Sequence, residues 1–208
     1  MLTLTFTVFT LLTVRAARTR IHSQAQRLEE LAGQDMLTGL DNRLRFTDIA
    51  TREAARIHRT GEESSLILMD LDRFKNVNDT YGHPVGDEVL RKAAGVIQSN
   101  VRDTDHVARF GGEEFIILLP GTSTDGARVV ADKVRHALSE CSFGPPTENL
   151  HITASFGVAS LSYDRDATPD AGCPVEHSSQ VDRAYQAADS AMYHAKRNGR
   201  NRVEVAPV

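Results

Sequence analysis

Carboxylate residues that follow apolar runs are the first candidates for chemistry in this chain. Asp70 and Asp72 stand at the end of an apolar run, and Glu113 and Glu114 follow two glycines. At the strand period of two, Asp70 and Asp72 point to the same side. Carboxylates are rarely buried without a partner, so several of them at one place would require a hard cation, and their oxygen atoms suit Mg²⁺. The spacing alone leaves open the alternative that these acids only line the edges of a sheet.

A pair of glycines, Gly111 and Gly112, separates the apolar runs Val107–Phe110 and Phe115–Leu119. Glycine adopts positive φ without steric cost, so the pair is expected at both central positions of a tight hairpin turn. A hairpin packed beside the strand that ends at Asp70 would bring one or both of the glutamates to Asp70. Neighbouring strand residues point to opposite faces, so the turn must reorient one of these glutamates.

The periodicity of the whole chain predicts an α+β fold, in which a mostly antiparallel central sheet is flanked by helices. The segment 162–179 contains two prolines and a glycine and is expected to be a loop. Strands are predicted at 65–71, 107–110, 115–119, 151–161 and 202–205, and helices at 86–98, 124–138 and 181–197.

The amino-terminal segment Met1–Val14 is uncharged and apolar, and three arginines follow it within six residues. As a helix it would be about 21 Å long, which is short of the ~30 Å hydrocarbon core of a bilayer. Three interpretations stay open: the end of a membrane helix, a membrane-surface or signal-like segment, and a soluble packing helix. Arginines after the apolar run predict that the remaining chain is cytoplasmic, attached to the inner membrane under the first interpretation.

Residues 15–34 are expected to form a coiled-coil-like signalling helix. The alternative is an amphipathic helix that leans on the following domain, because barely two heptads are visible. The heptad positions are Val14, Ala17, Ile21, Gln24, Leu28 and Leu31.

Charge and cysteine content exclude two classes of function. The 24 basic and 28 acidic residues give a net charge of -4, which argues against a nucleic-acid partner. Cys141 and Cys173 are far apart and outside any metal-ligand spacing. Neither a zinc site nor a disulfide framework is therefore predicted.

Four ordered motifs resemble the GGDEF family of diguanylate cyclases. Gly111–Phe115 is similar to the family signature in its GGEEF form, and Asp35–Arg43 resembles the opening D-x-L-T-G-L-x-N-R. Asp70–Asp87 resembles the D-x-D-x-F-K-x-x-N-D-x-x-G-H motif and its continuation, and Ala188–Arg202 resembles the closing A-D-x-A-x-Y-x-A-K-x-x-G-R-N. The resemblance implies a palm-like, nucleotidyl-cyclase-like sandwich as the catalytic domain, over residues 35–206.

The resemblance also implies roles for individual residues. Asp87 would accept hydrogen bonds from N1–H and the exocyclic amine of guanine, which adenine cannot supply. Two Mg²⁺ or Mn²⁺ ions per active site are implied, held by Asp70, Glu113, Glu114 and the Leu71 carbonyl, with the three acids also counted as catalytic. The implied substrate-binding residues are Phe74, Lys75, Asn78, Asp87, Gly111, Gly112, Lys196 and Arg200.

The implied reaction is the condensation of two GTP molecules into cyclic di-GMP across a homodimer. An R-x-x-D pattern, Arg102 to Asp105, stands at the offset of the family's product-inhibition site. The competing hypothesis is a degenerate GGDEF domain that acts as a nucleotide or cyclic di-GMP receptor. The retained carboxylates and glycines favour the enzyme.

Overall fold

The computed structural model describes residues 33–143, 150–162 and 177–207. The apolar segment 1–14 and nearly all of the coiled-coil-like segment 15–34 lie outside these residues, as does most of the predicted loop 162–179. Among the described helices, none combines the length and the apolar character that crossing a membrane requires.

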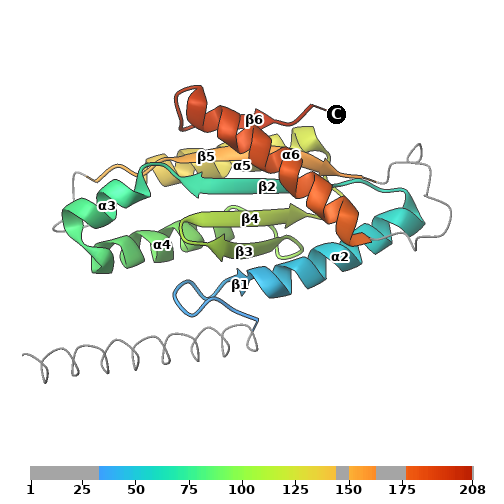
Figure 1. Ribbon diagram of the computed structural model, residues 1–208, viewed down its shortest axis with the longest axis horizontal. Helices are drawn as coiled ribbons and strands as arrows, with labels where there is room; N and C mark the ends of the chain where they lie inside the picture. Colours follow the sequence, from blue (N-terminus) through green and yellow to red (C-terminus); the bar gives the residue numbers. More distant parts are fainter. Residues whose placement is uncertain (1–32, 144–149, 163–176, 208) are drawn as a thin grey trace, which may run out of the picture.

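Six strands of the described chain form one mixed sheet in the order β1-β3-β4-β2-β5-β6 (Figure 1). The three central pairings, β3 with β4, β4 with β2 and β2 with β5, are antiparallel. The edge strands β1 and β6 pair in parallel with β3 and β5. The predicted mostly antiparallel sheet is therefore confirmed. The strands are β1 Asp41–Asn42, β2 Ser64–Leu71, β3 His106–Gly111, β4 Glu114–Leu119, β5 Ala154–Leu161 and β6 Val203–Val205.

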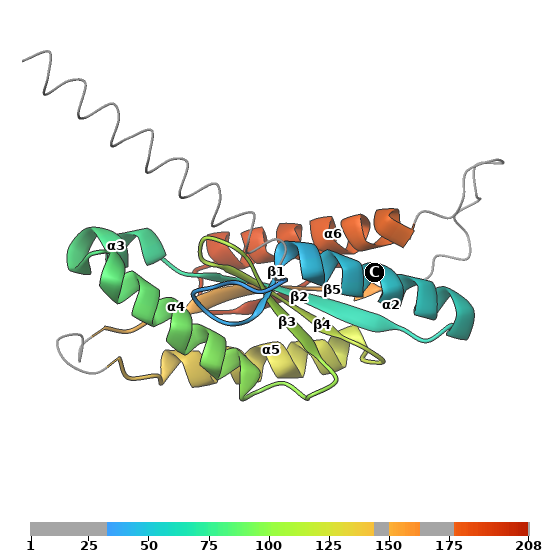
Figure 2. The ribbon, with the colours of Figure 1, turned by 90° about the horizontal axis from the view of Figure 1, so that it is seen from below.

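Helices cover both faces of the sheet, so the molecule has three layers (Figure 2). Helices α4 and α5 pack on one face, and α2 and α6 pack on the other. Each face of the sheet has its own apolar core, because alternate residues of the central strands point to opposite faces. The helices are α2 Arg43–Thr60, α3 Phe74–Tyr81, α4 His83–Gln98, α5 Thr124–Ser139 and α6 His177–Arg197.

Strand β2 is the centre of the sheet, and all eight of its residues are buried. Ile67 and Met69 belong to the core under α4 and α5, whereas Leu66 and Leu68 belong to the core under α2 and α6. Each such side chain contributes about 1.5 to 3 kcal/mol on burial. Asp70 continues the series of Leu66 and Leu68, so its carboxylate emerges on the face that α6 covers.

Helix α6 lies directly on β5 because a glycine permits the contact. A Cβ atom at Gly157 would lie 1.9 Å from the carbonyl oxygen of Ala188 and 2.4 Å from the nitrogen of Met192. Only hydrogen fits in that space. This close approach fixes the position of the last turn of α6, which carries Lys196.

Two helices were not predicted, and several boundaries were wrong. Helix α2 begins at the cap Asn42, whose side chain accepts a 3.0 Å hydrogen bond from the Arg45 amide, and ends at Gly61, with φ 71°. Helix α3 is only eight residues long. Helix α4 begins three residues earlier than expected and β5 three residues later, and α6 begins inside the expected loop, at His177. The loop prediction is therefore wrong for residues 177–179.

Candidate active site

The end of β2 brings two of the predicted carboxylates into register. Asp70 lies directly opposite Glu114 in the antiparallel pairing of β2 with β4. The Nζ atom of Lys196, on α6, lies 2.8 Å from Asp70 Oδ2. The pair β2 and β4 and the helix α6 thus bring two carboxylates and one ammonium group together at the end of β2.

The glycine turn differs from the expected one by one residue. Strand β3 ends at Gly111 and β4 begins at Glu114, so the two residues between the strands are Gly112 and Glu113. Both glycines have positive φ, 157° and 50°, but the prediction that both occupy the central turn positions is wrong. Two neighbouring residues within a strand would point to opposite faces. Glu113 and Glu114 are not bound by this rule, because Glu114 is a strand residue and Glu113 is a turn residue. The carbonyl oxygen of Glu113 accepts a 3.3 Å hydrogen bond from the amide of Leu71, next to Asp70.

Negative charge at this point exceeds the positive charge that contacts it. Burial raises the pKa of Asp70, against the opposing effect of Lys196. Burial, and then the charge of Asp70, raise the pKa values of both Glu113 and Glu114. Binding of a cation at this point would therefore favour the ionised forms of all three acids.

The donor atoms suit a hard divalent cation, because they are carboxylate oxygens in a region of excess negative charge. In the described part of the chain, however, no three His, Cys, Asp or Glu side chains are close enough together to hold an ion as they stand. Glu113 and Glu114 are only half-buried. Ligation by the expected set, Asp70, Glu113, Glu114 and the Leu71 carbonyl, therefore requires side-chain movement.

The residues expected to bind guanine lie where α3 meets α4. A Cβ atom on Gly86 would lie 2.0 Å from Asn78 Oδ1 and 3.2 Å from the ring of Phe74. The amide of Asn78 thus packs directly onto the glycine that precedes Asp87. A side chain at residue 86 would therefore displace the Asn78 amide.

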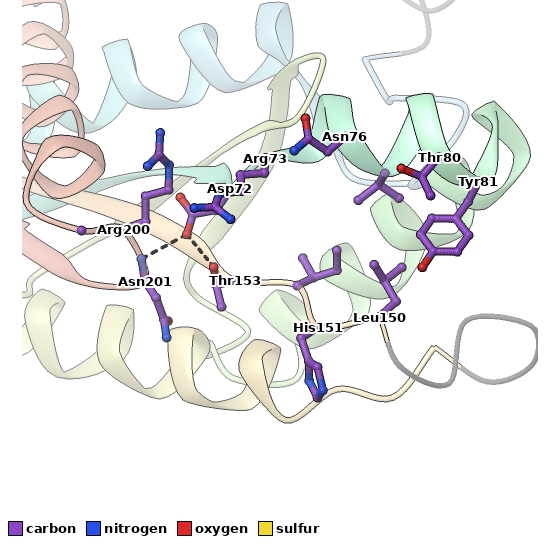
Figure 3. Close-up of a pocket in the computed structure, with 13 residues that line it drawn as sticks. Asp72, Arg73, Asn76, Thr80, Tyr81, Leu150, His151, Thr153, Arg200 and Asn201 are labelled. Carbon is purple, nitrogen blue, oxygen red and sulfur yellow. Dashed lines mark hydrogen bonds between the residues drawn. The ribbon is translucent and has the colours of Figure 1, made fainter.

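The residues expected to bind phosphate come from two separate turns. Phe74 and Lys75 begin α3, with Phe74 buried and Lys75 exposed. Arg200 is exposed, lies in the turn after α6 with φ 65°, and favours the ionised form of Asp70. Arg200 lines a cavity of about 380 Å³ together with Arg73, which precedes α3, whereas Phe74 and Lys75 are not among the residues that line it (Figure 3).

Arg109 is a site residue that the sequence reasoning missed. Its Nε and Nη2 atoms donate hydrogen bonds of 3.0 and 2.7 Å to the carbonyl oxygen of Gly112. The turn that carries Glu113 is therefore held by a side chain from β3. The only available signal was the position of an arginine two residues before the glycine pair.

A second cavity, of about 330 Å³, contains both residues of the R-x-x-D pattern. Arg102 and Asp105 line it together with Asp103 and the loop at Gly39–Asp41. The backbone amide of Arg102 donates a 2.8 Å hydrogen bond to Asp105 Oδ2. The predicted inhibitory pair thus shares one hollow, on the side of the molecule where β1 begins.

Comparison with known proteins agrees with this arrangement. Residues 32–202 match the family model described as diguanylate cyclase, GGDEF domain. The chain is 38% identical over 185 residues to diguanylate cyclase DgcP of Pseudomonas aeruginosa, covering 89% of this chain and 26% of that protein. It is 39% identical over 176 residues to response regulator PleD of Caulobacter vibrioides, covering 84% and 36%. The chain thus spans well under half the length of these curated relatives.

Solved structures give the same result. The coiled coil and GGDEF domain of DgcB from Caulobacter crescentus, solved in complex with c-di-GMP, matches with a TM-score of 0.72 and 30% identity, covering 94% of this chain and 97% of that one. The active GGEEF domain of a diguanylate cyclase from Vibrio cholerae matches with a TM-score of 0.69 and 36% identity, covering 80% and 97%. The chain belongs to the GGDEF domain family of diguanylate cyclases.

Proposed function

We propose that this chain is an active diguanylate cyclase, which condenses two GTP molecules into cyclic di-GMP and two pyrophosphates. The observation that carries the proposal is the direct opposition of Asp70 and Glu114 across β2 and β4, with Lys196 on Asp70. A receptor that had lost catalysis would be expected to have lost acids or glycines here. The intact set favours the enzyme over the receptor hypothesis.

In the proposed reaction, the 3′-hydroxyl oxygen of one GTP forms a bond to the α-phosphorus of the other. The bond from that phosphorus to the bridging oxygen breaks, pyrophosphate leaves with the electrons of that bond, and the proton of the hydroxyl is released to solvent. A second attack of the same kind, in which the two nucleotides exchange roles, closes the ring and releases the second pyrophosphate. Mg²⁺ or Mn²⁺, held by Asp70, Glu113, Glu114 and the Leu71 carbonyl, would lower the pKa of the hydroxyl and stabilise charge on the phosphoryl oxygens.

The residues of this chain would bind and orient the substrate. Asn78 and Asp87 would select guanine at the junction of α3 and α4. Lys75, Lys196 and Arg200 would neutralise the triphosphate, and the backbone amides near Phe74 would contact it. Gly111 and Gly112 would let the nucleotide approach the backbone. Glu114 would help to hold metal or to position the attacking hydroxyl.

Each domain would bind one GTP, so catalysis would require two domains to meet face to face as a symmetric pair. The segment 15–34 would set their distance and rotation, and the segment 1–14 would associate with the membrane. Arg102 and Asp105 would bind the guanine of cyclic di-GMP and inhibit the enzyme. The cavity that they share supports this role.

The decisive experiment incubates the purified chain with GTP and Mg²⁺ and identifies the products by chromatography and mass. Cyclic di-GMP and pyrophosphate, at a rate per domain that rises with protein concentration, are expected. Intact GTP binding without any cyclic di-GMP, at concentrations where the chain is dimeric, would favour the receptor hypothesis instead.

A further inference from the structure

Asp72, two residues after Asp70, is a buried carboxylate whose partners are neutral donors; it is only 8% exposed. Its Oδ1 atom accepts a 2.7 Å hydrogen bond from Ser155 Oγ. Its Oδ2 atom accepts one of 2.7 Å from Thr153 Oγ1 and one of 3.0 Å from the backbone nitrogen of Asn201. No arginine, lysine or histidine of the described residues forms a salt bridge with it.

This carboxylate joins the two turns that were assigned above to phosphate binding. On one side, Asp72 is followed by Arg73, which has φ 57° and precedes the first residue of α3. On the other side, Arg200 and Asn201 have φ values of 65° and 44°. Figure 3 shows Asp72 between these turns, with its bonds to Thr153 and Asn201 drawn as dashed lines.

Three residues with left-handed backbones need external support. Left-handed φ is unfavourable for residues other than glycine, and it persists only where surrounding contacts determine it. The turn after α6 is held at one end by the amide of Arg200, which donates a 2.9 Å hydrogen bond to the Ala195 carbonyl. The bond from the Asn201 amide to Asp72 holds its other end. Asn201 Oδ1 also accepts a 3.3 Å hydrogen bond from Arg135, but the bond to Asp72 is the one that ties this end of the turn to the strand end before α3.

We propose that Asp72 is a positioning residue for the phosphate end of the substrate. It holds the turn at Arg200 against the start of α3, so that the guanidinium of Arg200 and the amides near Phe74 converge on one triphosphate. It does not touch the nucleotide. This inference rests on the proposed function, because that function assigns these two turns to GTP.

The alternative role for Asp72 is that of a metal ligand beside Asp70, and the two roles differ in what Asp72→Asn does. The oxygen of asparagine can replace Oδ2 and keep the bonds from Thr153 and Asn201, while its amide donates to Ser155 Oγ, which can accept. A positioning role needs only these bonds and survives the substitution. A ligand role needs the charge and does not.

The test measures binding of 3′-deoxy-GTP, which lacks the attacking hydroxyl, and of GMP, by calorimetry with Mg²⁺ present. Asp72→Ala is expected to weaken 3′-deoxy-GTP binding at least about tenfold, the effect of one lost charge-assisted contact, and to leave GMP binding nearly unchanged. Asp72→Asn is expected to stay within about threefold of the unaltered protein for both nucleotides. The ratio of the two affinities therefore isolates the phosphate end from general loss of structure.

A double-mutant cycle tests whether Asp72 acts through Arg200. In an Arg200→Ala background, Asp72→Ala is expected to add less than about threefold to the loss of 3′-deoxy-GTP affinity, because its target is already gone. Glu53→Ala is the matched control: it removes another buried carboxylate, which lies on α2 and accepts a hydrogen bond from Ser64 at the start of β2, and it is expected to lower stability without changing the affinity ratio. If Asp72→Ala does not fold, Thr153→Val removes one donor to the same oxygen and should lower the ratio by about threefold.

Two outcomes would overturn the inference. One is an Asp72→Asn protein as weak as Asp72→Ala, which would make charge the requirement. The other is an unchanged affinity ratio in a folded Asp72→Ala protein. Failure of the proposed function looks different, since the unaltered chain would then make no cyclic di-GMP even though the affinity ratios behave as expected.

Discussion

Arg109 and Asp35, 74 positions apart in the chain, form an ion pair with 3.0 Å between Nη1 and Oδ2, and both side chains are largely buried. Asp35 also accepts hydrogen bonds from the amide and hydroxyl of Thr38, of 2.8 and 2.6 Å. Arg109 contacts Gly112 as well, so one guanidinium joins the start of the domain to the glycine turn. We therefore expect a displacement of the chain at residue 35 to reach the turn that carries Glu113 through Arg109.

Arg109→Ala is expected to lower kcat by about 10- to 100-fold, because the turn loses its brace and Glu113 its position. Stability should fall by about 2 kcal/mol, since the carboxylate of Asp35 keeps its burial but loses a charged donor. Arg109→Lys should not restore activity, because an ammonium cannot reproduce the fork that spans both partners. Steady-state kinetics and urea unfolding check both effects. Arg52→Ala, in an exposed pair on α2, is the control, and loss of stability with unchanged kcat would contradict the coupling.

Glu114→Gln is expected to reduce turnover by a factor on the order of 10³, because it removes a charged oxygen from the proposed metal and hydroxyl site. The fold should not be destabilised, since the raised pKa of Glu114 means that its ionised form is disfavoured by the folded state. Activity assays and thermal unfolding without metal provide the measurements. Glu140→Gln, at an exposed position, is the control. Turnover within tenfold of the original would remove Glu114 from the catalytic set.

Gly86→Ala is expected to raise the KM for GTP by about tenfold and to weaken the preference for GTP over ATP. The added methyl group would occupy the place of the Asn78 amide, and so misplace a guanine contact worth about 1 to 2 kcal/mol. Gly95→Ala is a matched control on the same helix, because a Cβ atom there meets nothing within 4 Å. That control should gain up to about 1 kcal/mol of stability and keep its KM. Equal KM values for the two variants would exclude the proposed guanine site.

Arg102→Ala is expected to raise the concentration of cyclic di-GMP needed for half-inhibition by at least about tenfold, since a forked charged contact to the product is lost. Initial rates at low product should not change, because the cavity of Arg102 is separate from Asp70 and Glu114. Rates measured over a series of added product concentrations check this. Arg91→Ala, an exposed position on α4, serves as the control. Inhibition that is the same in both variants would leave Arg102 without a role.

Glu53→Gln is expected to destabilise the fold by about 1 to 3 kcal/mol at pH 7. Burial alone would raise the pKa of Glu53, but hydrogen bonds from Arg56 and Ser64 outweigh it and lower the pKa below its ordinary value of 4.5. The stabilising effect is therefore complete above the unfolded pKa and is lost as the pH falls through the lower, folded pKa. Urea unfolding at pH 7, 5.5 and 4 should show the two proteins converging only at the acid end. A difference that does not change with pH would mean that the charge of Glu53 is not involved.

The parts of the fold that the sequence predicted are those with a strong apolar pattern. The runs that became β2 and β4 are continuous and buried, so their type and their approximate ends were clear. Helix α2 has a buried face of Phe46, Ala50, Ala54 and Ile57, at helical spacing. Two of these four are alanines, which contribute little to a hydropathy pattern, and the helix was missed.

Local patterns could not supply features that depend on tertiary contacts. Helix α3 is too short for periodicity, and it starts from Arg73, which has a left-handed backbone and makes no side-chain capping hydrogen bond. The pairing of Asp70 with Glu114 depends on the register between strands more than forty residues apart. The one-residue shift of the turn depends on the irregular pairing between Arg109 and Gly111, which no residue type signals by itself.

The burial of β2 has a consequence for how the domain can be switched. Asp70 is anchored on the strand with the most complete shielding from solvent, so its amide is expected to exchange with deuterium only when the whole domain unfolds. An input signal is therefore not expected to move Asp70, because that movement would require the free energy of unfolding the domain. Under the proposed function, control is instead expected to act on parts that cost little to open, which are the exposed turn at Gly112 and the proposed encounter between two nucleotide-loaded domains.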